Sequence, residues 1–233
     1  RATCIELAKT GIKQVIGNRN EEKGNEVVEI IRKNGGEAEF IRTDVSKAED
    51  VKNLVDFTLN KFGQFQYAFN NSGLLGDVEP LATQKPEDSS YIVDVNIKGV
   101  IYCMHYQIQE MLKYAAQDNP CSIVNNSSIS AFANVGGNIS YAASKGAILS
   151  FVKSIANGLG GTRVNAIAPG LIEDSAMFNE MSIERREFHR QQKSNKQLLD
   201  ISDFSRIIFD LSRNHWKHLN GACIDLNAGQ YVR

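Results

Sequence analysis

The stretch Ser122-Ile123-Val124-Asn125-Asn126-Ser127-Ser128 and the segment Tyr141-Ala142-Ala143-Ser144-Lys145 that follows it decide how this chain is interpreted. The first contains a short apolar strand, predicted from Cys121 to Val124, that ends in a polar cluster. The second begins a predicted helix, Tyr141–Leu159, on which Tyr141 and Lys145 lie four residues apart and share one face. A buried strand that leads through polar groups into a helix is typical of a layered α/β fold.

The same alternation of strand and helix runs along the whole chain. Further strands are predicted at Gln14–Gly17, Ala38–Ile41, Tyr67–Phe69, Thr162–Ile167 and Ala222–Leu226. Helices are predicted to end at Thr10-Gly11 and to cover Glu21–Lys33, Lys47–Phe62, Ser89–Ala116 with a break near Asn96, and Ile201–Arg213. Leu171–Gln197 is a charged excursion with a short helix. Because no linker interrupts the alternation, we predict a single α/β domain with a doubly wound parallel sheet covered on both faces, in three layers.

Composition excludes several classes of protein. The chain has 233 residues with a formal net charge of −1 and no basic block, so we predict no nucleic-acid partner. No apolar run is long enough to span a membrane. The four cysteines are widely spaced and form no CxxC pair, which favours free thiols in a reducing, cytoplasmic compartment. We predict no metal site.

The residues Ser128, Tyr141 and Lys145 together predict acid–base chemistry on an alcohol or a carbonyl. A free phenol has a pKa of about 10, and a neighbouring ammonium lowers it towards neutrality. Ser128 can hold a substrate oxygen while Tyr141 donates or accepts its proton. A Tyr and a Lys four residues apart are common in helices, so the pair alone is weak evidence. Three further motifs strengthen it: Asn70-Asn71-Ser72-Gly73, Asn96-Ile97-Lys98-Gly99, and Arg163 to Gly170.

Taken together, these motifs resemble the classical branch of the short-chain dehydrogenase/reductase family, over essentially the whole chain. The resemblance implies a Rossmann-like fold and an oxidoreductase that transfers hydride between a nicotinamide cofactor and a small alcohol or carbonyl substrate. It implies that Tyr141 is the general acid in reduction and the general base in oxidation. It also implies that Lys145 binds the nicotinamide ribose, that Ser128 holds the substrate oxygen, and that Asn96 breaks its helix and supports a water in the proton relay.

The cofactor contacts follow partly from the residues and partly from the resemblance. Asn18 and Arg19 follow the predicted strand Gln14–Gly17, which corresponds to the second strand of a dinucleotide-binding fold. A carboxylate at this place would favour NAD, whereas an amide and a guanidinium favour NADP(H), with NAD possible. Arg19 capping a surface turn is the alternative. The resemblance places Asp44 and Val45 at the adenine, although Asp44 also suits a turn before Ser46. Its remaining implied contacts are Asn71, Ser72 and Gly73 under the adenine ribose, and Pro169, Gly170 and Ile172 beside the nicotinamide.

The resemblance also implies a first strand and a glycine-rich turn before Arg1, and the sequence contains neither. Without that central strand we expect two half-sheets that face each other with unpaired backbone groups. We expect the natural protein to be about twenty residues longer. The alternative is a non-catalytic binding protein with this fold.

A second alternative within the fold is a 3-oxoacyl carrier-protein reductase. Its acidic carrier would need a basic surface, which Arg185, Arg186, Arg190 and Lys193 could supply; the interleaved Glu184 and Glu187 favour an ordinary solvated helix face instead.

The predicted helix Tyr141–Leu159 carries more small and apolar residues than packing on a sheet requires, so we predict a homodimer or homotetramer. By resemblance, this helix and the preceding long helix would pair across a two-fold axis. The substrate itself is not predicted. Its pocket should be lined by Leu74–Val78, Phe132–Val135 and Leu171–Gln197, because these stretches match the family least and loops carry specificity.

Overall fold

The computed structural model describes residues 1–115, 120–133 and 139–231. Its strands form two parallel sheets. The first pairs β1 (Gln14–Asn18) with β2 (Ala38–Arg42). The second has the order β3 (Tyr67–Asn70), β4 (Cys121–Asn126), β5 (Thr162–Pro169), β6 (Cys223–Leu226). All the predicted strands are confirmed. β4 runs further than predicted because it stays paired with β5 through Asn126, past the point where its side chains become polar. β5 runs further because it stays paired with β6 through Pro169.

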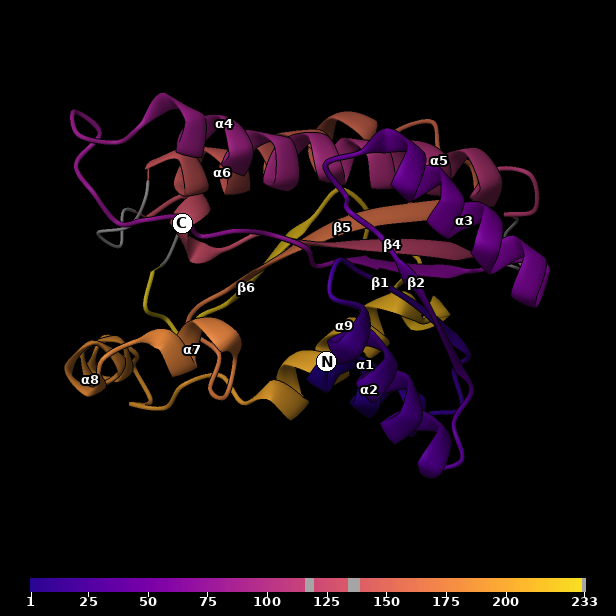
Figure 1. Cartoon of the computed structure of the whole chain (residues 1–233), viewed down its shortest axis with the longest axis horizontal. Helices are drawn as coiled ribbons and strands as arrows, with labels where there is room; N and C mark the ends of the chain where they lie inside the picture. Colours follow the sequence, from indigo (N-terminus) through magenta and orange to yellow (C-terminus); the bar gives the residue numbers. More distant parts are fainter. Residues whose placement is uncertain (116–119, 134–138, 232–233) are drawn as a thin grey trace.

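Helices cover both faces of the sheets, which confirms the doubly wound α/β prediction (Figure 1). One face carries α3 (Ala48–Phe62), α4 (Pro86–Val93), α5 (Gly99–Met111) and α6 (Ile139–Ile155). The other face carries α1 (Ala2–Ala8), α2 (Glu21–Lys33) and α9 (Ile201–Ser212). The apolar core between the four-stranded sheet and α5–α6 centres on Ile123, Val164 and Ile148, each at most 1% exposed.

The long helix predicted at Ser89–Ala116 is divided into three parts. It begins at Pro86, because proline suits the first turn of a helix, and α5 ends at Met111. The predicted break is a π-helical turn, Asp94–Lys98, with Asn96 at its centre. Ala116, the predicted end, lies outside the described residues.

Other helix boundaries also differ from the prediction. Helix α6 begins at Ile139 and ends at Ile155, before Leu159. The charged excursion forms two short helices, α7 (Ala176–Glu180) and α8 (Ile183–Gln191), each with a serine N-cap.

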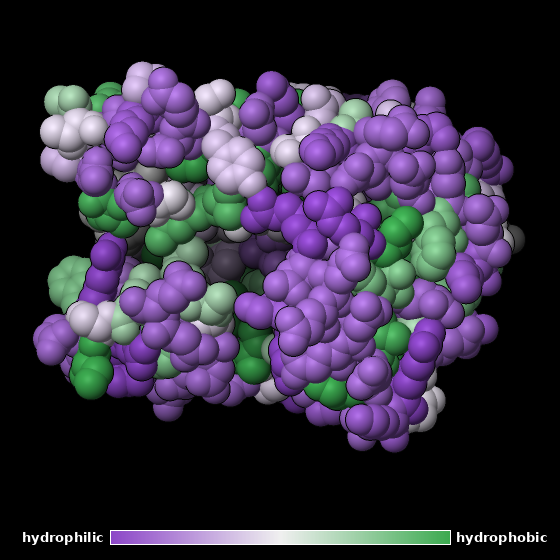
Figure 2. Space-filling model, in the orientation of Figure 1, coloured by the Kyte–Doolittle hydropathy of each residue, from purple (hydrophilic) through white to green (hydrophobic). Residues whose placement is uncertain are grey.

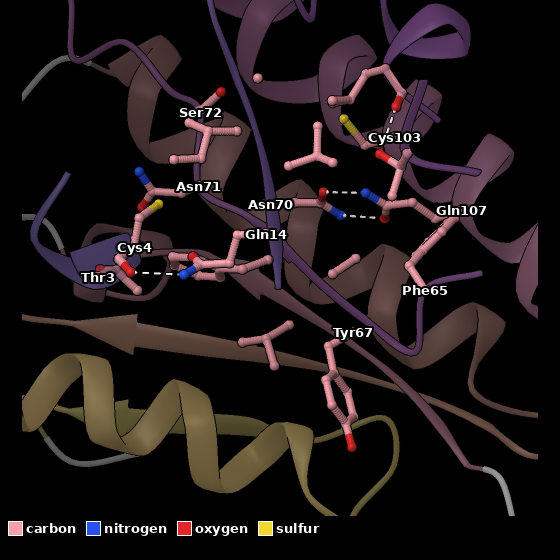
Figure 3. Close-up of a pocket in the computed structure, with 18 of the residues that line it drawn as sticks. Thr3, Cys4, Gln14, Phe65, Tyr67, Asn70, Asn71, Ser72, Cys103 and Gln107 are labelled. Atoms are coloured by element: carbon pink, nitrogen blue, oxygen red, sulfur yellow. Dashed lines mark hydrogen bonds between the residues drawn. The ribbon is translucent and has the colours of Figure 1, made fainter. Parts of the chain in front are cut away.

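A cavity of about 610 Å³ separates the two sheets (Figure 3). It is lined by β1, β3 and the helices that flank them, and the amide pair Asn70–Gln107 lies at one side. Among the described residues, β1 pairs only with β2 and β3 only with β4, so each strand presents one unpaired edge. The strands of the described residues are therefore divided between two sheets, as the sequence analysis expects.

Candidate active site

Three buried side chains meet beside the carboxyl end of β4. Ser128 follows that strand by two residues, and α6 presents Tyr141 and Lys145 one turn apart. The hydroxyls of Ser128 and Tyr141 are hydrogen-bonded to each other. The Lys145 Nζ donates to the Asn126 carbonyl oxygen at 2.7 Å and lies 5.6 Å from the centre of the Tyr141 ring. The structure therefore brings together the three residues that the sequence singled out, and none is more than 9% exposed.

Burial controls the acidity of this group. It raises the pKa of Tyr141, and the hydrogen bond with Ser128 acts in the opposite direction without reversing the shift. Burial also lowers the pKa of Lys145 to about 8. The pKa of the phenol is therefore raised, opposite to the predicted direction, because removing the phenolate from water outweighs the hydrogen bond with Ser128; the effect of Lys145 on this pKa stays a prediction.

Asn96 joins three segments around this group. It is fully buried in the π-helical turn, and its Oδ1 accepts from the Leu74 N–H at 2.8 Å. Its Nδ2 donates to the Leu74 carbonyl at 2.9 Å and to the Ser144 Oγ at 3.0 Å. The amide therefore holds the segment after β3 against α6. The predicted break at Asn96 is confirmed, and its role in holding a water stays a prediction.

Two polar residues of the site were missed by the sequence reasoning. Asn126 accepts from Lys145 through its carbonyl and donates from Nδ2 to the Asn71 Oδ1 at 2.9 Å. Its own Oδ1 is buried and has no partner in the described part of the chain. Ser144 lies between Tyr141 and Lys145 and accepts from Asn96. Its position one turn after Tyr141 was a usable signal, because it puts Ser144 on the same helix face.

A second cavity, of about 240 Å³, lies at the carboxyl ends of β1 and β3. Its lining contains seven of the predicted cofactor residues: Asn18, Arg19, Asp44, Val45, Asn71, Ser72 and Gly73. Thr43, Leu74 and Val95 also line it and were not predicted. The other five predicted contacts are not part of this lining: Pro169, Gly170 and Ile172 lie at and just beyond the end of β5, and Tyr141 and Lys145 belong to α6.

The backbone passes close to the buried polar groups at Gly73. A Cβ added there would lie 3.3 Å from the Lys145 Nζ and 3.4 Å from the Asn96 Oδ1. This glycine lets the chain pass close to Lys145 and Asn96 beside the cavity, as expected where a ligand approaches backbone. The orphaned Oδ1 of Asn126 and this close approach both fit a polar ligand that lies along the ends of β3 and β4.

Arg19 extends across the cavity mouth to α4. Its Nη1 donates to the Tyr91 hydroxyl, and its guanidinium lies 5.9 Å from the centre of that ring. The turn before α2 is capped by Asn20, whose side chain accepts from the Lys23 N–H at 2.8 Å. Arg19 is therefore not the cap of that turn, which removes the alternative reading of this residue.

Asp44 is the turn residue that the sequence allowed. Its Oδ1 accepts from the Ser46 N–H at 3.1 Å and from the Ser46 hydroxyl at 2.7 Å. Burial raises the pKa of Asp44, but these hydrogen bonds and the positive charges of Arg19 and Lys47 outweigh it and lower the pKa overall. An ionised acceptor thus remains on the cavity wall.

Of the four basic residues considered for a surface at α8, three are paired or buried, and Arg185 is the exception. Arg190 pairs with Glu187 at 2.7 Å and with Glu173 at 3.6 Å. Arg186 donates to two backbone carbonyls of α7. Lys193 is only 1% exposed, so it belongs to the interior and not to the surface.

A hollow opens between the α4–α6 side and the α7–α8 side of the molecule, and apolar residues lie on both rims (Figure 2). Val78 and Leu81 precede α4, and Ile183 and Phe188 belong to α8; all four are exposed. The predicted substrate stretches Leu74–Val78 and Leu171–Gln197 include or adjoin these residues. In the predicted stretch Phe132–Val135, positions 134 and 135 lie outside the described residues.

None of the helices in the described ranges is both long and apolar enough to cross a membrane. Within the same ranges, His, Cys, Asp and Glu side chains form no group of three or more that could hold a metal ion.

Comparison with known proteins adds family relationships to this geometry. Residues 1–186 match the family described as short chain dehydrogenase. A 3-oxoacyl-[acyl-carrier-protein] reductase from Staphylococcus epidermidis is 28% identical over the whole of this chain and 94% of its own length. A cyclohexanol dehydrogenase from an Acinetobacter species is 31% identical over 74% of this chain and 68% of its own length. The solved structure of NAD⁺-bound xylitol dehydrogenase superposes with a TM-score of 0.90 at 22% identity, over 98% of this chain and 93% of that one.

Proposed function

This chain belongs to the short-chain dehydrogenase/reductase family of NAD(P)-dependent oxidoreductases, and from that premise we propose that Tyr141 exchanges the proton while hydride moves to or from a small carbonyl or alcohol substrate. The observation that carries the proposal is the buried group at the end of β4, where the Ser128 and Tyr141 hydroxyls are hydrogen-bonded one turn from Lys145. A nicotinamide dinucleotide, when bound, supplies or accepts the hydride.

In the proposed mechanism each residue has one task. Ser128 donates a hydrogen bond to the substrate oxygen and so fixes it next to Tyr141. In reduction the phenol donates its proton to that oxygen as negative charge develops; in oxidation the phenolate removes the proton from the alcohol. A raised phenol pKa keeps Tyr141 protonated at neutral pH, which suits the acid role in reduction. Lys145, held by the Asn126 carbonyl, supplies positive charge beside the phenol.

The proposed test removes only the phenol hydroxyl. Tyr141→Phe should lower turnover on the order of a hundredfold or more, the usual size of acid–base catalysis, while the folded structure persists. Tyr106→Phe, the same change on α5, is the matched control and should keep turnover. The measurement is the change in nicotinamide absorbance with a panel of ketones and alcohols. Full activity in Tyr141→Phe would remove Tyr141 from the mechanism.

We also propose that NADP(H) is preferred over NAD(H). Arg19 lies on the cavity wall beside Asn18, and the nearby carboxylate, Asp44, is occupied by Ser46. Arg19→Ala should weaken NADP(H) by about tenfold to a hundredfold, because a charge-assisted bidentate contact with the 2′-phosphate is lost, and should leave NAD(H) nearly unchanged. Arg42→Ala, an exposed arginine at the end of β2, is the control. An equal loss for both cofactors would contradict the preference.

The cavity between the sheets supports a further part of the proposal. Its two flanking strands, β1 and β3, each have one unpaired edge in the described chain, and a single additional parallel strand would pair with both. We expect the complete dinucleotide site to need such a strand followed by a turn into α1. A chain that carries an apolar strand and a glycine-rich turn ahead of Arg1 should bind dinucleotide more tightly than residues 1–233, as measured by quenching of Trp216 or Tyr fluorescence. Equal affinity would contradict this expectation.

A 3-oxoacyl carrier-protein reductase is the second candidate, because relatives with that activity align along the whole chain. The ion pairs of Arg190 with Glu173 and Glu187 argue against docking of an acidic carrier on α8. Comparison of a 3-oxoacyl thioester on carrier protein with the same acyl group on N-acetylcysteamine separates the two candidates. A strong preference for the carrier-bound form would favour the second candidate.

We propose that the protein is a homodimer or homotetramer through α5 and α6. Ile101 on α5 and Leu112 directly after it are exposed, and Ala143 and Ser150 are exposed on α6. Such a surface suits close pairing of helices across a two-fold axis. Light scattering at micromolar concentration should give an even multiple of the chain mass of 25.8 kDa. A mass of one chain would contradict the proposal.

A further inference from the structure

Lys193 is a buried cation that the mechanism above does not use. It follows α8 and is the largest side chain that is almost fully buried, with 1% exposure. Its Nζ has one long hydrogen bond, to the Gln230 Oε1 at 3.4 Å, and it forms no ion pair with any described carboxylate. A buried ammonium without a counter-ion is unfavourable, and such groups in native proteins usually serve a ligand or a reaction.

Two further polar atoms beside Lys193 also lack partners. The Gln230 Nε2 and the His189 Nδ1 are buried and have no hydrogen-bond partner in the described part of the chain. His189 lies four residues before Lys193, and burial lowers its pKa, with the positive charges of Arg185 and Lys193 acting in the same direction. The lowered pKa favours the neutral imidazole, so Lys193 supplies the positive charge in the buried part of this cluster. That charge matches a monoanion, such as a carboxylate, better than a phosphate dianion.

The cluster lies at the functional edge of the sheet. A Cβ added to Gly170 would lie only 2.6 Å from the Lys193 Nζ, so the ammonium rests directly on the backbone just after β5. Gly170 donates to the Leu226 carbonyl at the end of β6. The neighbouring strand on the other side of β5 is β4, and Ser128 follows its end. In parallel α/β sheets, ligands bind outside the carboxyl ends of the strands, where this cluster and Ser128 both lie.

We propose that Lys193 and the Gln230 amide bind a carboxylate of the substrate, which makes the substrate class an oxo acid or the corresponding hydroxy acid. This inference rests on the proposed function, since it assigns the second anchor point of the same substrate. Ser128 and Tyr141 hold the reacting oxygen at the end of β4, and Lys193 holds the acid group at the ends of β5 and β6. Two anchor points fix the carbon between them for hydride transfer.

The first test uses a matched pair of substrates and needs no variant. Acetoacetate and methyl acetoacetate share the reacting ketone and differ in the charge of the acid group. The protein, with saturating NADPH or NADH and with ionic strength held constant, should show a kcat/KM at least about tenfold higher for the acid, the size of one charge-assisted hydrogen bond. A kcat/KM for the ester equal to or above that for the acid would overturn the proposal.

The second test removes the charge. Lys193→Met keeps the length of the side chain and should abolish the preference for the acid, chiefly through KM, while the kcat/KM for the ester is retained. Lys196→Met, an exposed lysine three residues away, is the control and should behave like the unaltered protein. Lys193→Gln serves if the methionine variant does not fold. A preference for the acid that survives in Lys193→Met or Lys193→Gln would overturn the proposal.

A binding measurement separates this inference from the proposed function. Acetoacetate should raise the thermal unfolding midpoint of the unaltered protein but not of Lys193→Met, and methyl acetoacetate should not distinguish the two. This result would support the carboxylate site even if neither compound were reduced, in which case the proposed hydride transfer to these ketones would fail alone. Equal midpoint shifts by acid and ester would overturn the carboxylate site and leave the assignment of Tyr141 standing.

Discussion

Asn96→Ala should be strongly destabilising, because one fully buried amide holds three segments together. The substitution removes hydrogen bonds to the Leu74 N–H, the Leu74 carbonyl and the Ser144 Oγ, which span 2.8 to 3.0 Å. Each such bond contributes on the order of 1 kcal/mol net, and a buried group left without a partner costs about 1–3 kcal/mol. Leu74 is only half-buried, so water can replace part of what its backbone loses. The expected loss is therefore about 3 kcal/mol.

The assay is urea unfolding followed by fluorescence and circular dichroism at pH 7. A loss of about 3 kcal/mol should lower the midpoint by roughly 1 M or more at an unchanged slope. Asn60→Ala, an exposed position on α3, is the control and should change stability by less than about 0.5 kcal/mol. Ser144→Ala should be less costly alone and non-additive with Asn96→Ala, because the two share a hydrogen bond. A loss below about 1 kcal/mol for Asn96→Ala would refute this account of the π-helical turn.

Three other predictions concern single contacts. The pKa of Lys145 is about 8 in the folded protein and 10.5 in the unfolded chain, so the unfolded chain binds more protons between these pH values. The free energy of unfolding should therefore rise from about pH 8 to 10.5, relative to Lys145→Met, on the order of 1.4 kcal/mol per pH unit. Parallel pH profiles of the urea midpoint for the two proteins would contradict this. Tyr91→Phe keeps the ring beside Arg19 but removes the hydroxyl that accepts a hydrogen bond from Arg19. In a cofactor titration the affinity for NADP(H) should fall about twofold to tenfold, and the affinity for NAD(H) should not change. An equal change in both affinities would show that Tyr91 does not position Arg19. Gly24→Ala places a Cβ 2.1 Å from the Phe40 ring, so it should lower the free energy of unfolding in urea by about 1–3 kcal/mol despite the better helix propensity of alanine. The control Gly146→Ala, whose added Cβ has its nearest contact at 3.5 Å, should not destabilise the protein. A stable Gly24→Ala protein would show that Phe40 moves easily.

The strands and the central chemistry could be predicted from the sequence because their signals are local. Each parallel strand is buried on both faces and so forms a short apolar run, such as Ile123-Val124 in β4. The four-residue spacing of Tyr141 and Lys145 fixes their common face before any tertiary contact is known. Ser128 is placed by the end of its strand. These positions agree with the structure.

The features that could not be predicted depend on contacts between distant segments. Lys193 belongs to a stretch with alternating charges, Glu184 to Lys193, which is typical of a solvated helix face. It is buried because the turn after β6 closes over it, where the Ser194 hydroxyl donates to the Ala228 carbonyl at 2.6 Å. The contact of Arg19 with Tyr91 joins residues 72 positions apart. The acidity of Tyr141 is set by burial, which the local pattern does not give.

The carboxyl edge of the four-stranded sheet carries two buried ammonium groups, and neither forms an ion pair with a described residue. Lys145 is held by the Asn126 carbonyl at the end of β4, and Lys193 by the Gln230 amide beyond β5 and β6. Burial lowers the pKa of both, so keeping both protonated costs folding free energy, part of which an anionic ligand at the same edge can offset. The stability of the protein and its affinity for anionic ligands are therefore coupled. A ligand that pairs with either ammonium stabilises the folded chain by an amount that grows with the logarithm of its concentration once the site is saturated, and it raises the pKa of that lysine. The two buried charges destabilise the protein when no ligand is bound, and they also make this edge selective for anionic ligands, because a neutral ligand does not offset the cost of burying them.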